Sequence, residues 1–457
     1  MWSIQHLLAV FSFVLALILV SRVLRERRPP GSTLAWVFAM IVVPYVGVPL
    51  YLMIGGRKTG RLASTKRGLY SSVEFSMTPQ DAPTLERILL AAGMPPKTEA
   101  NSVSLLSSPT LAYTTLISQI RSARESIEIA TFILADDEVG TSIIEALRLK
   151  SQAGIRIRLL LDGFGSFFSP RRKLRNLVQA GAQVRFFMPI LKFPFPGISN
   201  LRNHRKVALI DGKSAIIGGM NLSCDYLAPK AGPRQWTDLC VLIEGEAAVE
   251  LQQIFLSDWA YAGGESFSAS VSSDRNSTGT DTVQVVATGP DVPADPLYDA
   301  LLLGIFAAKK RIWVATPYFV PDESLARALE LACRRGVDVR VLLPAKSNHM
   351  LADLSRGSYL KQIRQAGGSI LFYHAGMMHA KMVLIDNDFA FVGSANFDVR
   401  SLLLNYEAGV LMSSPRTVEM IQNWFESLLP ATRPAPLKEN FATDLIEGVG
   451  RVLGPML

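Results

Sequence analysis

The sequence predicts an α/β fold built from two homologous repeats, and three observations support this prediction. One phrase occurs twice, as HRKVALIDGKSAIIGGMN from His204 and as HAKMVLIDNDFAFVGSAN from His379. The segments around the two phrases also match each other, and two apolar runs precede them. We expect a mixed or parallel sheet flanked by helices, duplicated with pseudo-twofold symmetry and preceded by an N-terminal membrane hairpin.

The repeated phrase predicts a pair of strands joined by a tight turn. In both copies it runs His-x-Lys, four residues, Asp, six residues, and then Gly-[Gly/Ser]-x-Asn. The run after each His is rich in Val, Ile, Leu and Met, and it stops at Asp-Gly or Asp-Asn, which are hairpin-turn dipeptides. Side chains two apart on a strand share a face, so His204 and Lys206 point the same way, as do His379 and Lys381.

The residue types in the phrase suit a phosphate. The second strand of each pair ends in small residues followed by an Asn, which allows close backbone approach and supplies an amide donor. Each repeat thus offers an imidazole, an ammonium and an amide, and a histidine can attack phosphorus or move a proton. We expect one phosphodiester-handling site with His204, Lys206, His379 and Lys381 as catalytic residues and Asn221, Asn396, Ser394 and Gly219 as phosphate-binding residues.

The acidic member of the phrase has two interpretations. Asp211 and Asp386 complete the motif, and we include them in the catalytic set for that reason. Each nevertheless lies at odd spacing from its His and at a strand-ending turn, where Asp is common for backbone reasons. That position favours a structural role.

Outside the phrases, the repeats match over three further segments, which alternate apolar β-branched strands with amphipathic helices. SIEIATFIL from Ser126 matches RIWVATPYFV from Arg311, GIRIRLLLD from Gly154 matches GVDVRVLLP from Gly336, and LRNLVQAGAQVRFF from Leu174 matches LKQIRQAGGSILFY from Leu360. We divide the chain into a membrane anchor (1–56), a basic juxtamembrane linker (57–105), repeat 1 (106–262), a polar linker (263–282), repeat 2 (283–430) and an amphipathic tail (431–457).

The phrase is the HKD motif of the phospholipase D superfamily, and the chain resembles the bacterial cardiolipin synthase branch. Further segments similar to that branch are TPYFVPDESL from Thr316, GSANFDVRSLLLNYE from Gly393 and QWTDLCVLIEG from Gln235. The resemblance covers nearly the whole chain. It implies that the two phrases meet at the interface between the repeats, so that one site forms with two histidines facing each other.

The repeats also align beyond the phrases, and this alignment places Asp238 opposite Glu407. The resemblance implies that an acidic residue at this position accepts a hydrogen bond from the second nitrogen of a histidine. A neutral imidazole attacks through one nitrogen only if its proton is held on the other. We therefore expect Asp238 and Glu407 to orient the histidines.

The N-terminus carries two apolar runs, Leu7–Val20 and Leu34–Ile54, and the second has about the length needed to cross a bilayer. The first lacks the flanking charge and cleavage site of a signal peptide, so we expect a retained two-span anchor. Pro44 and Pro49 interrupt the second run, which leaves a kinked or re-entrant segment open. Basic residues on both sides leave the orientation open; the resemblance implies a multi-pass protein of the bacterial inner membrane with a cytoplasmic catalytic body.

The net charge of +8 indicates a partner that presents phosphates, either nucleic acid or anionic lipid. The apolar runs favour lipid, so we expect a membrane as partner and no nucleic acid. The resemblance implies that the lipid partners are phosphatidylglycerol and cardiolipin. Ordinary positive-inside topology also accounts for the basic residues after the second run, which are Arg57, Lys58, Arg61, Lys66 and Arg67. Three widely spaced cysteines suggest neither a disulfide framework nor a zinc site.

Two segments keep two interpretations each. Before His204, repeat 1 has an insert that carries Met188, Ile190, Leu191, Phe193 and Phe195, which either forms a lip that contacts acyl chains or covers the core. The C-terminal stretch Leu437–Leu457 has apolar residues near helical spacing, and it either lies on the membrane or packs against the body.

The expected reaction is ping-pong phosphatidyl transfer without cofactor or metal. By superfamily analogy His204 attacks phosphatidylglycerol and His379 acts as acid and base, although the roles could be reversed. Hydrolysis by water, or phosphatidylethanolamine as co-substrate, would need no other residue. A nuclease would not need the apolar runs, and a catalytically silent scaffold would not keep both phrases intact.

Overall fold

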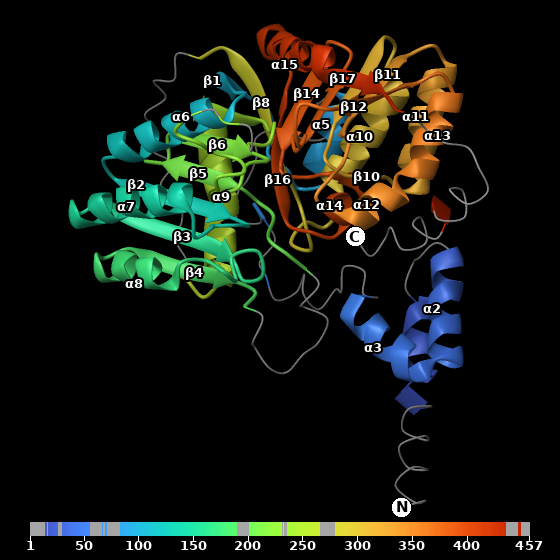
Figure 1. Cartoon of the computed structure of the whole chain (residues 1–457), viewed down its shortest axis with the longest axis horizontal. Coiled ribbons are helices and arrows are strands. Elements are labelled where there is room, and N and C mark those ends of the chain that lie inside the picture. Colours follow the sequence, from blue (N-terminus) through green and yellow to red (C-terminus); the bar gives the residue numbers. More distant parts are fainter. Residues whose placement is uncertain are drawn as a thin grey trace, which may run out of the picture. The chain divides into compact units, whose positions relative to one another are not determined.

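The computed structural model describes residues 14–15, 17–25, 30–54, 66, 69–70, 83–189, 201–230, 232, 235–265, 279–435 and 447–448. The chain forms two compact units (Figure 1). The smaller unit comprises Met1–Thr59 and Ile190–Leu201, and the larger comprises Gly60–Pro189 and Arg202–Leu457.

The smaller unit is helical, and its second apolar run forms two helices instead of one. Helix α2 (Pro30–Val42) has 13 residues and α3 (Pro44–Ile54) has 11. The break precedes Pro44, which has no N–H to continue the helical hydrogen bonds and begins the next helix instead. The helices pack so closely that a Cβ on Gly47 would lie 2.2 Å from the carbonyl oxygen of Ala39.

The break between α2 and α3 corresponds to the kinked segment that Pro44 and Pro49 left open as an alternative to one continuous span. At about 1.5 Å per residue, each helix is shorter than the roughly 30 Å apolar thickness of a bilayer. Among the described residues, no helix combines the length and apolarity of a membrane span. Apolar side chains such as Leu34, Phe38 and Tyr45 are exposed on these helices. Most of the first apolar run lies outside the described residues, so two complete spans stay a prediction.

The larger unit is organised around one sheet of 15 strands in the order β17-β12-β11-β9-β13-β14-β16-β8-β1-β7-β6-β5-β2-β3-β4. Outward from the central β8–β1 pair, equivalent strands follow in the same order on both sides, and β17 is an additional edge strand of repeat 2. This arrangement gives the expected duplication. The strands are β1 Thr98–Leu106, β2 Ser126–Thr131, β3 Arg156–Asp162, β4 Gln183–Phe187, β5 Val207–Ile210, β6 Ser214–Gly218, β7 Cys240–Gly245, β8 Asp281–Thr288, β9 Arg311–Ala315, β11 Asp338–Pro344, β12 Ser369–Tyr373, β13 Met382–Ile385, β14 Phe389–Gly393, β16 Glu407–Met412 and β17 Thr432–Pro434; β10 Phe319–Val320 and β15 Phe397–Asp398 pair separately.

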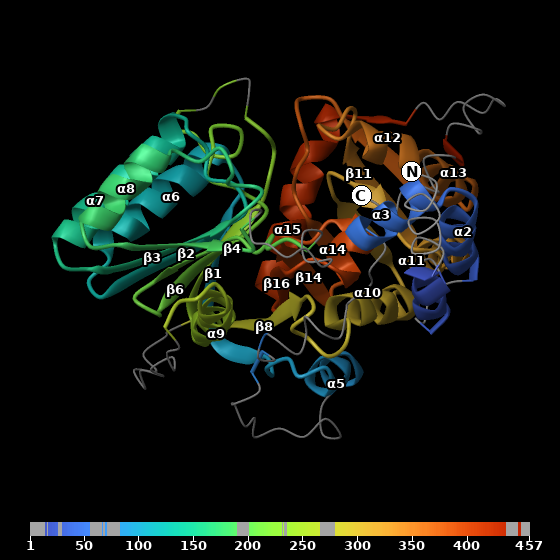
Figure 2. The same cartoon turned by 90° about the horizontal axis from the view of Figure 1, so that it is seen from below.

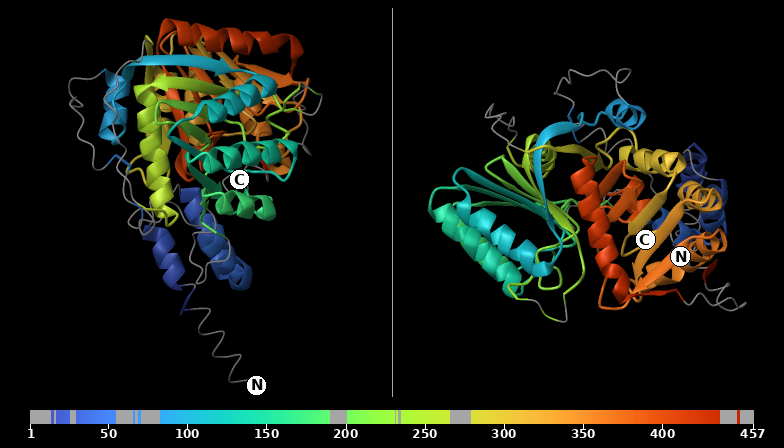
Figure 3. Two further views of the ribbon diagram at one scale, coloured as in Figure 1. Left: turned by 90° about the vertical axis from the view of Figure 1, so that its left-hand side faces the viewer. Right: turned by 90° about the horizontal axis from the view of Figure 1, so that it is seen from above.

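Helices cover both faces of each half of the sheet. Figure 2 shows α6, α7 and α8 on one face of repeat 1 and α9 on the other, and Figure 3 shows α15 along the strands of repeat 2. The helices of this unit are α5 Thr84–Ala91, α6 Pro109–Ser122, α7 Glu138–Gln152, α8 Arg171–Gln179, α9 Glu246–Tyr261, α10 Pro296–Ala307, α11 Glu323–Arg334, α12 Met350–Ser355, α13 Gly357–Gln365, α14 Val399–Leu403 and α15 Pro415–Leu428.

The sheet is mixed, and most of its strand pairs are antiparallel. Within this sheet the parallel pairs are confined to two groups of three strands, β2–β3–β4 and β9–β11–β12, and β17 joins β12 antiparallel. The strand pair of each phrase then returns antiparallel, with Val207 opposite Ala130 and Met382 opposite Ala315. This register places each His-x-Lys at the edge of the sheet where β2 and β9 end.

Several predicted segments are described only in part. Within the predicted linker 57–105 the structure has α5 and β1. In the insert before His204, Met188 is buried, and residues 190–200 lie outside the described residues, as do 266–278 of the polar linker. In the tail, Glu447 Oε2 lies 2.8 Å from Lys361 Nζ of α13, so at this residue the tail packs against the body.

Asp211 and Asp386 lie at the hairpin turns, away from the histidines. Both adopt the left-handed backbone conformation, with φ of 53° and 49°. The Asp386 carboxylate accepts hydrogen bonds at 2.8 Å from the backbone N–H groups of Lys309, Lys310 and Arg311 at the start of β9. Asp211 does the same for residues 124–126 before β2. These contacts support the structural interpretation of both residues.

We predict that Asp386→Ala lowers the free energy of unfolding by about 2 kcal/mol, because it leaves three backbone N–H groups without their charged acceptor. The backbone hydrogen bonds outweigh burial and lower the pKa of Asp386 below its usual 3.8. Its contribution is therefore complete above pH 3.8 and is lost as the pH falls through the lower folded value. Denaturant unfolding across pH measures this, with the exposed Asp388→Ala as control; an unchanged stability would contradict the turn-anchoring role.

Candidate active site

Each histidine of the two phrases contacts a carboxylate from the other repeat. His379 of repeat 2 places Nδ1 at 2.7 Å from Asp238 Oδ2 of repeat 1. His204 of repeat 1 places Nδ1 at 3.2 Å from Glu407 Oε1 of repeat 2. Both carboxylates are fully buried. The structure thus brings together the four residues that the sequence predicted, and it adds that the partners are exchanged between repeats.

Backbone hydrogen bonds hold this exchange in place. The His204 N–H donates to the carbonyl of Tyr406 at 2.9 Å, and the Tyr406 N–H donates back to Arg202 at 3.1 Å. In the other half, the His379 N–H donates to the carbonyl of Thr237 at 2.7 Å. Tyr406 and Thr237 immediately precede the two carboxylate residues. Each histidine segment therefore pairs, through an isolated parallel β-bridge, with the segment that supplies its carboxylate.

His379 is neutral near neutral pH. Burial and the charge of Lys381 lower its pKa to about 4, although Asp238 opposes them. The Asp238 carboxylate at Nδ1 favours the tautomer with its proton on Nδ1 and its lone pair on Nε2. Lys381 Nζ lies 2.6 Å from Nδ1 and 3.2 Å from Nε2. The Lys381 ammonium donates to the backbone carbonyl of His379. Burial, more than any other cause, lowers the pKa of Lys381 to about 7.

The two histidines have different aromatic neighbours, which sequence analysis did not single out. The Tyr226 hydroxyl lies 3.5 Å from His379 Nε2, and the ring of Trp236 lies 5.2 Å from the imidazole. His204 instead has the Phe132 ring at 4.2 Å, and its side chain is 23% exposed, compared with 8% for His379. One histidine is enclosed, and the other is open.

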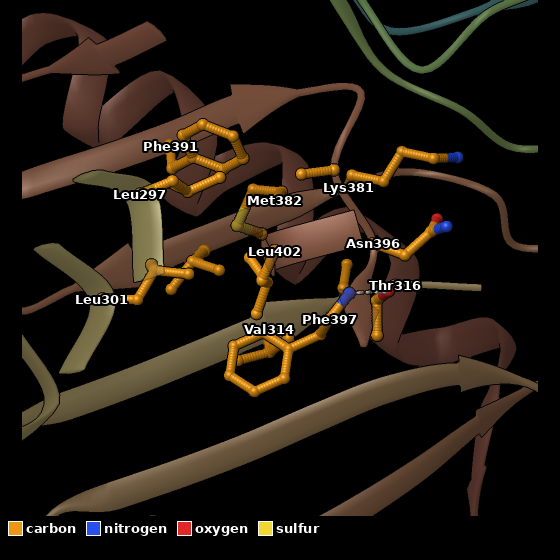
Figure 4. A pocket seen from close by; sticks show the side chains of 13 residues that line it. Leu297, Leu301, Val314, Thr316, Lys381, Met382, Phe391, Asn396, Phe397 and Leu402 are labelled. Atoms are coloured by element: carbon orange, nitrogen blue, oxygen red, sulfur yellow. Dashed lines mark hydrogen bonds between the residues drawn. The ribbon is translucent and has the colours of Figure 1, made fainter. Parts of the chain in front are cut away.

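A small apolar cavity lies beneath each lysine of the phrases. In repeat 2, Figure 4 shows Lys381 and Asn396 with their polar ends turned away from a cavity lined by residues such as Leu301 and Phe391. The equivalent cavity in repeat 1 borders Lys206. Apolar surroundings disfavour the charged ammonium, which explains why burial lowers the pKa of both lysines.

The predicted phosphate-binding residues divide into two groups. Ser394 donates to Glu407 Oε2 at 2.5 Å, and a Cβ on Gly219 would lie 2.2 Å from Asp238 Oδ1. The structure therefore places both against the carboxylates. Asn221 Oδ1 accepts from the Ile133 N–H at 3.2 Å. Asn396 Nδ2 donates to Ser401 Oγ at 3.2 Å. Both asparagine side chains are thus held by hydrogen bonds, and Asn396 lies beside Lys381 (Figure 4).

A buried charge cluster lies directly behind His204. Arg205 donates from Nη1 to Asp258 at 2.7 Å and from Nη2 to Asp291 at 3.1 Å. The ammonium of Lys66 contacts the same two carboxylates. Two positive and two negative charges therefore balance in a site removed from water. Burial alone would lower the pKa of Arg205, but the two carboxylates outweigh it and raise that pKa overall.

This cluster corrects one expectation and adds a contact to the site. The sequence groups Lys66 with basic residues that either attraction to lipid headgroups or positive-inside topology would explain, but Lys66 is buried in the larger unit. Arg205 also donates from Nε to the carbonyl of Glu407 at 3.2 Å, so it ties the cluster to the residue that contacts His204. The equivalent residue in repeat 2 is Ala380, which is also buried. The cluster is thus a feature of the His204 half alone.

The chain matches known proteins along nearly all of its length. Residues 116–259 and 301–429 match the family described as "Cardiolipin synthase, PLD-like domain", and residues 14–56 match "phospholipase D-nuclease N-terminal". The chain belongs to the cardiolipin synthase family of phospholipase D-like proteins. It is therefore a member of a family of membrane-associated phosphatidyltransferases that act on phospholipids.

Named relatives and solved structures agree with this assignment. The chain is 33% identical to "Cardiolipin synthase 1" of Bacillus cereus over 94% of this chain and 90% of that protein. It is 30% identical to "Major cardiolipin synthase ClsA" of Bacillus subtilis over 100% of both chains. The fold is similar to that of phosphatidylserine synthase from Haemophilus influenzae, with a TM-score of 0.62, 15% identity, and coverage of 82% of this chain and 100% of that one.

We predict that Arg205→Met lowers the free energy of unfolding by about 3–5 kcal/mol, because it leaves a net negative charge buried. It also lowers kcat at least tenfold at a temperature where the variant stays folded. The reason is that the Glu407 carbonyl loses the hydrogen bond that it accepts from Arg205. The matched control is Arg158→Met, which breaks the buried Arg158–Glu128 pair in the middle of repeat 1. Equal loss of kcat in both variants would show that the effect is only one of stability.

The low pKa of Lys381 predicts the alkaline limb of the pH profile. A lysine with a pKa of about 7 is charged below that pH and neutral above it. If Lys381 holds anionic oxygens, kcat/KM falls as the pH rises above about 7, while kcat falls at higher pH because bound phosphate favours the charged form. Lys381→Arg shifts the kcat/KM limb upward, since Arg stays protonated. An unshifted limb would rule out Lys381 as its source.

Proposed function

We propose that this protein transfers a phosphatidyl group from one phosphatidylglycerol to another, giving cardiolipin and glycerol. The observation that carries this proposal is the pair of histidines in one site, each with a carboxylate from the other repeat at its Nδ1. Such a site has one imidazole to attack phosphorus and a second to move protons. Family membership favours phospholipid as substrate over other phosphodiesters.

In the first step, Nε2 of one histidine forms a bond to phosphorus, and the bond from phosphorus to the glycerol oxygen breaks. The second histidine gives its proton to that oxygen, so free glycerol leaves and a phosphatidyl-histidine remains. Lys206, Lys381 and the two asparagine amides stand where they can hold the phosphoryl oxygens. The ammonium groups supply positive charge in place of a metal.

In the second step, the terminal hydroxyl of another phosphatidylglycerol gives its proton to the second histidine and attacks the phosphorus. The bond from phosphorus to the first histidine breaks, which releases cardiolipin and restores both imidazoles. One phosphodiester is formed for each one broken, so the exchange needs no nucleotide. The two half-reactions use the same groups in reverse order.

The assignment of the two roles rests on the resemblance, which gives the attack to His204 and the proton transfer to His379. Without substrate His379 is neutral, so in this assignment it takes up a proton as the anionic phosphate enters the site. In the reverse assignment the neutral imidazole of His379 attacks phosphorus without a change of its protonation state. Rapid alkaline quenching followed by peptide mass spectrometry identifies the histidine that carries the phosphatidyl group.

Hydrolysis is the second candidate, and the exposure of His204 is the observation that favours it. Water in place of the second lipid would give phosphatidic acid from the same intermediate. Phosphatidylethanolamine in place of one phosphatidylglycerol would also need no other residue. We further propose that the protein is a multi-pass protein of the bacterial inner membrane and that the catalytic body is cytoplasmic.

We predict that the detergent-solubilised full chain converts labelled phosphatidylglycerol to equal amounts of cardiolipin and glycerol without nucleotide. His204→Ala and His379→Ala each lower the rate by about 1,000-fold or more, since each removes one of the two proton-transfer or bond-forming groups. The exposed His374→Ala is the control and keeps the full rate. Phosphatidic acid as the sole product would establish hydrolysis instead, and full activity of either catalytic variant would refute the two-histidine mechanism.

A further inference from the structure

Three phenylalanines are exposed on one loop of repeat 1, directly after β3. This loop, residues 163–170, is called the aromatic tip below. Phe168 is 87% exposed, Phe164 59% and Phe167 46%, and the rings of Phe167 and Phe168 meet edge to face at 5.1 Å. Exposed aromatic residues gathered on one loop are unusual for a protein surface that faces only water.

The aromatic tip is a firmly built loop. Asp162 accepts hydrogen bonds at 2.9 Å from the backbone N–H groups of Phe164 and Gly165. Ser166 Oγ donates to the carbonyl of Phe132 at 2.8 Å. A Cβ on Gly165 would lie 2.4 Å from that same carbonyl oxygen, so the loop backbone packs tightly on Phe132. The phenylalanines are therefore held outward by the loop's own structure.

The same contacts join the aromatic tip to the candidate active site. Asp162 Oδ2 accepts a hydrogen bond at 3.0 Å from the backbone N–H of Asn203, the residue before His204. The Phe132 ring lies 4.2 Å from the His204 ring. One residue, Phe132, separates the tip from His204 on the second path, and two residues, Asp162 and Asn203, separate them on the first. The aromatic tip is thus joined to the His204 half of the site.

Repeat 2 has an equivalent apolar projection, residues 345–351, called the methionine tip below. It follows β11, the counterpart of β3, and Met350 is 74% exposed and Leu351 41%. The Tyr318 hydroxyl donates to Asn348 Oδ1 at 2.6 Å, which fixes this segment to the loop that leaves β9. Duplication has therefore kept an apolar projection in both halves, with different side chains.

Both tips lie at the edge of the sheet that carries the His-x-Lys phrases. β3 and β11 run parallel to β2 and β9, and all four strands end at this edge. The phrases begin at the same edge, because Val207 pairs with Ala130 and Met382 with Ala315. The site therefore lies between two apolar projections, one from each repeat.

Positive charge accompanies the apolar side chains. Helix α8 begins directly after the aromatic tip, and Arg171, Arg172 and Arg175 are exposed on it. Lys346 is exposed within the methionine tip. Apolar side chains beside exposed cations match the chemistry of a bilayer surface with anionic headgroups, where apolar groups enter the acyl region and cations stay among the phosphates.

We propose that the two tips dock the catalytic body onto the surface of an anionic lipid bilayer, so that a phospholipid passes between them into the site. The proposal rests on the proposed function, because a two-chain lipid substrate must leave a bilayer to reach the histidines. It adds a membrane contact made by the catalytic body itself.

The first test compares a lipid in a bilayer with the same headgroup in free solution. Phe167→Ser with Phe168→Ser lowers kcat/KM about tenfold or more on long-chain phosphatidylglycerol in vesicles that contain the reconstituted full chain. On monomeric short-chain phosphatidylglycerol the same variant stays within about twofold of the parent. Met350→Ser with Leu351→Ser gives the same pattern. Equal losses on both substrates, or no loss on either, would overturn the proposal.

Matched controls come from exposed apolar residues at the opposite edge. Leu149 lies near the end of α7, which leads into β3, and Phe306 near the end of α10, which leads into β9. Both are about half exposed, at 54% and 47%. Leu149→Ser and Phe306→Ser leave both activities unchanged. A loss on vesicles as large as that of the tip variants would overturn the proposal, since it would show that any exposed apolar residue has this effect.

A second test reads bilayer contact without using activity. The tryptophan introduced by Phe168→Trp loses its added fluorescence in vesicles with brominated acyl chains, and the one introduced by Phe306→Trp does not. Absence of quenching at position 168 would overturn the proposal. So would shielding of position 168 that depends on protein concentration in detergent, which indicates contact between copies of the chain. If the parent protein transferred no phosphatidyl group to either substrate, the proposed function would fail while quenching still tested the tips.

Discussion

Each histidine of the two phrases is held by the repeat that does not contain it, and the site depends on this exchange. The carboxylates of Asp238 and Glu407 reach the imidazoles across the interface, and backbone hydrogen bonds from His204 and His379 set the register. Neither repeat alone can therefore supply an oriented histidine. The duplication makes one site instead of two because each half completes the other.

The symmetry of the backbone does not extend to the electrostatics. His379 is enclosed by Tyr226 and Trp236 and is neutral at neutral pH, whereas His204 is open and stands before a balanced cluster of buried charges. A reaction with one attacking group and one proton carrier needs two unequal histidines. Arg205 of repeat 1 corresponds to Ala380 of repeat 2, so this position is one where the two repeats differ in charge.

The sequence predicted the features that depend on local pattern. The repeated phrase located the two strand pairs, and Pro44 marked the helix break. The sequence also placed His204 and Lys206 on a strand, whereas both precede β5, which begins at Val207. It did not predict which repeat supplies each carboxylate, because an alignment pairs Asp238 with Glu407 without placing either in space. Nor did it reveal Tyr226 and Lys66, since the equivalent of Tyr226 in the other repeat is Ser401 and one lysine in a basic segment carries no sign of burial.

The exchange between repeats can be measured directly from the protonation of His379. Exchange of the imidazole C2 proton, followed by peptide mass spectrometry across pH, gives the pKa of this one histidine. We predict that Asp238→Asn in repeat 1 lowers the pKa of His379 further, because the carboxylate that favours the charged imidazole is lost, and that Glu407→Gln in repeat 2 leaves it within error. If Glu407→Gln shifted the pKa of His379 and Asp238→Asn did not, the exchanged pairing would be wrong.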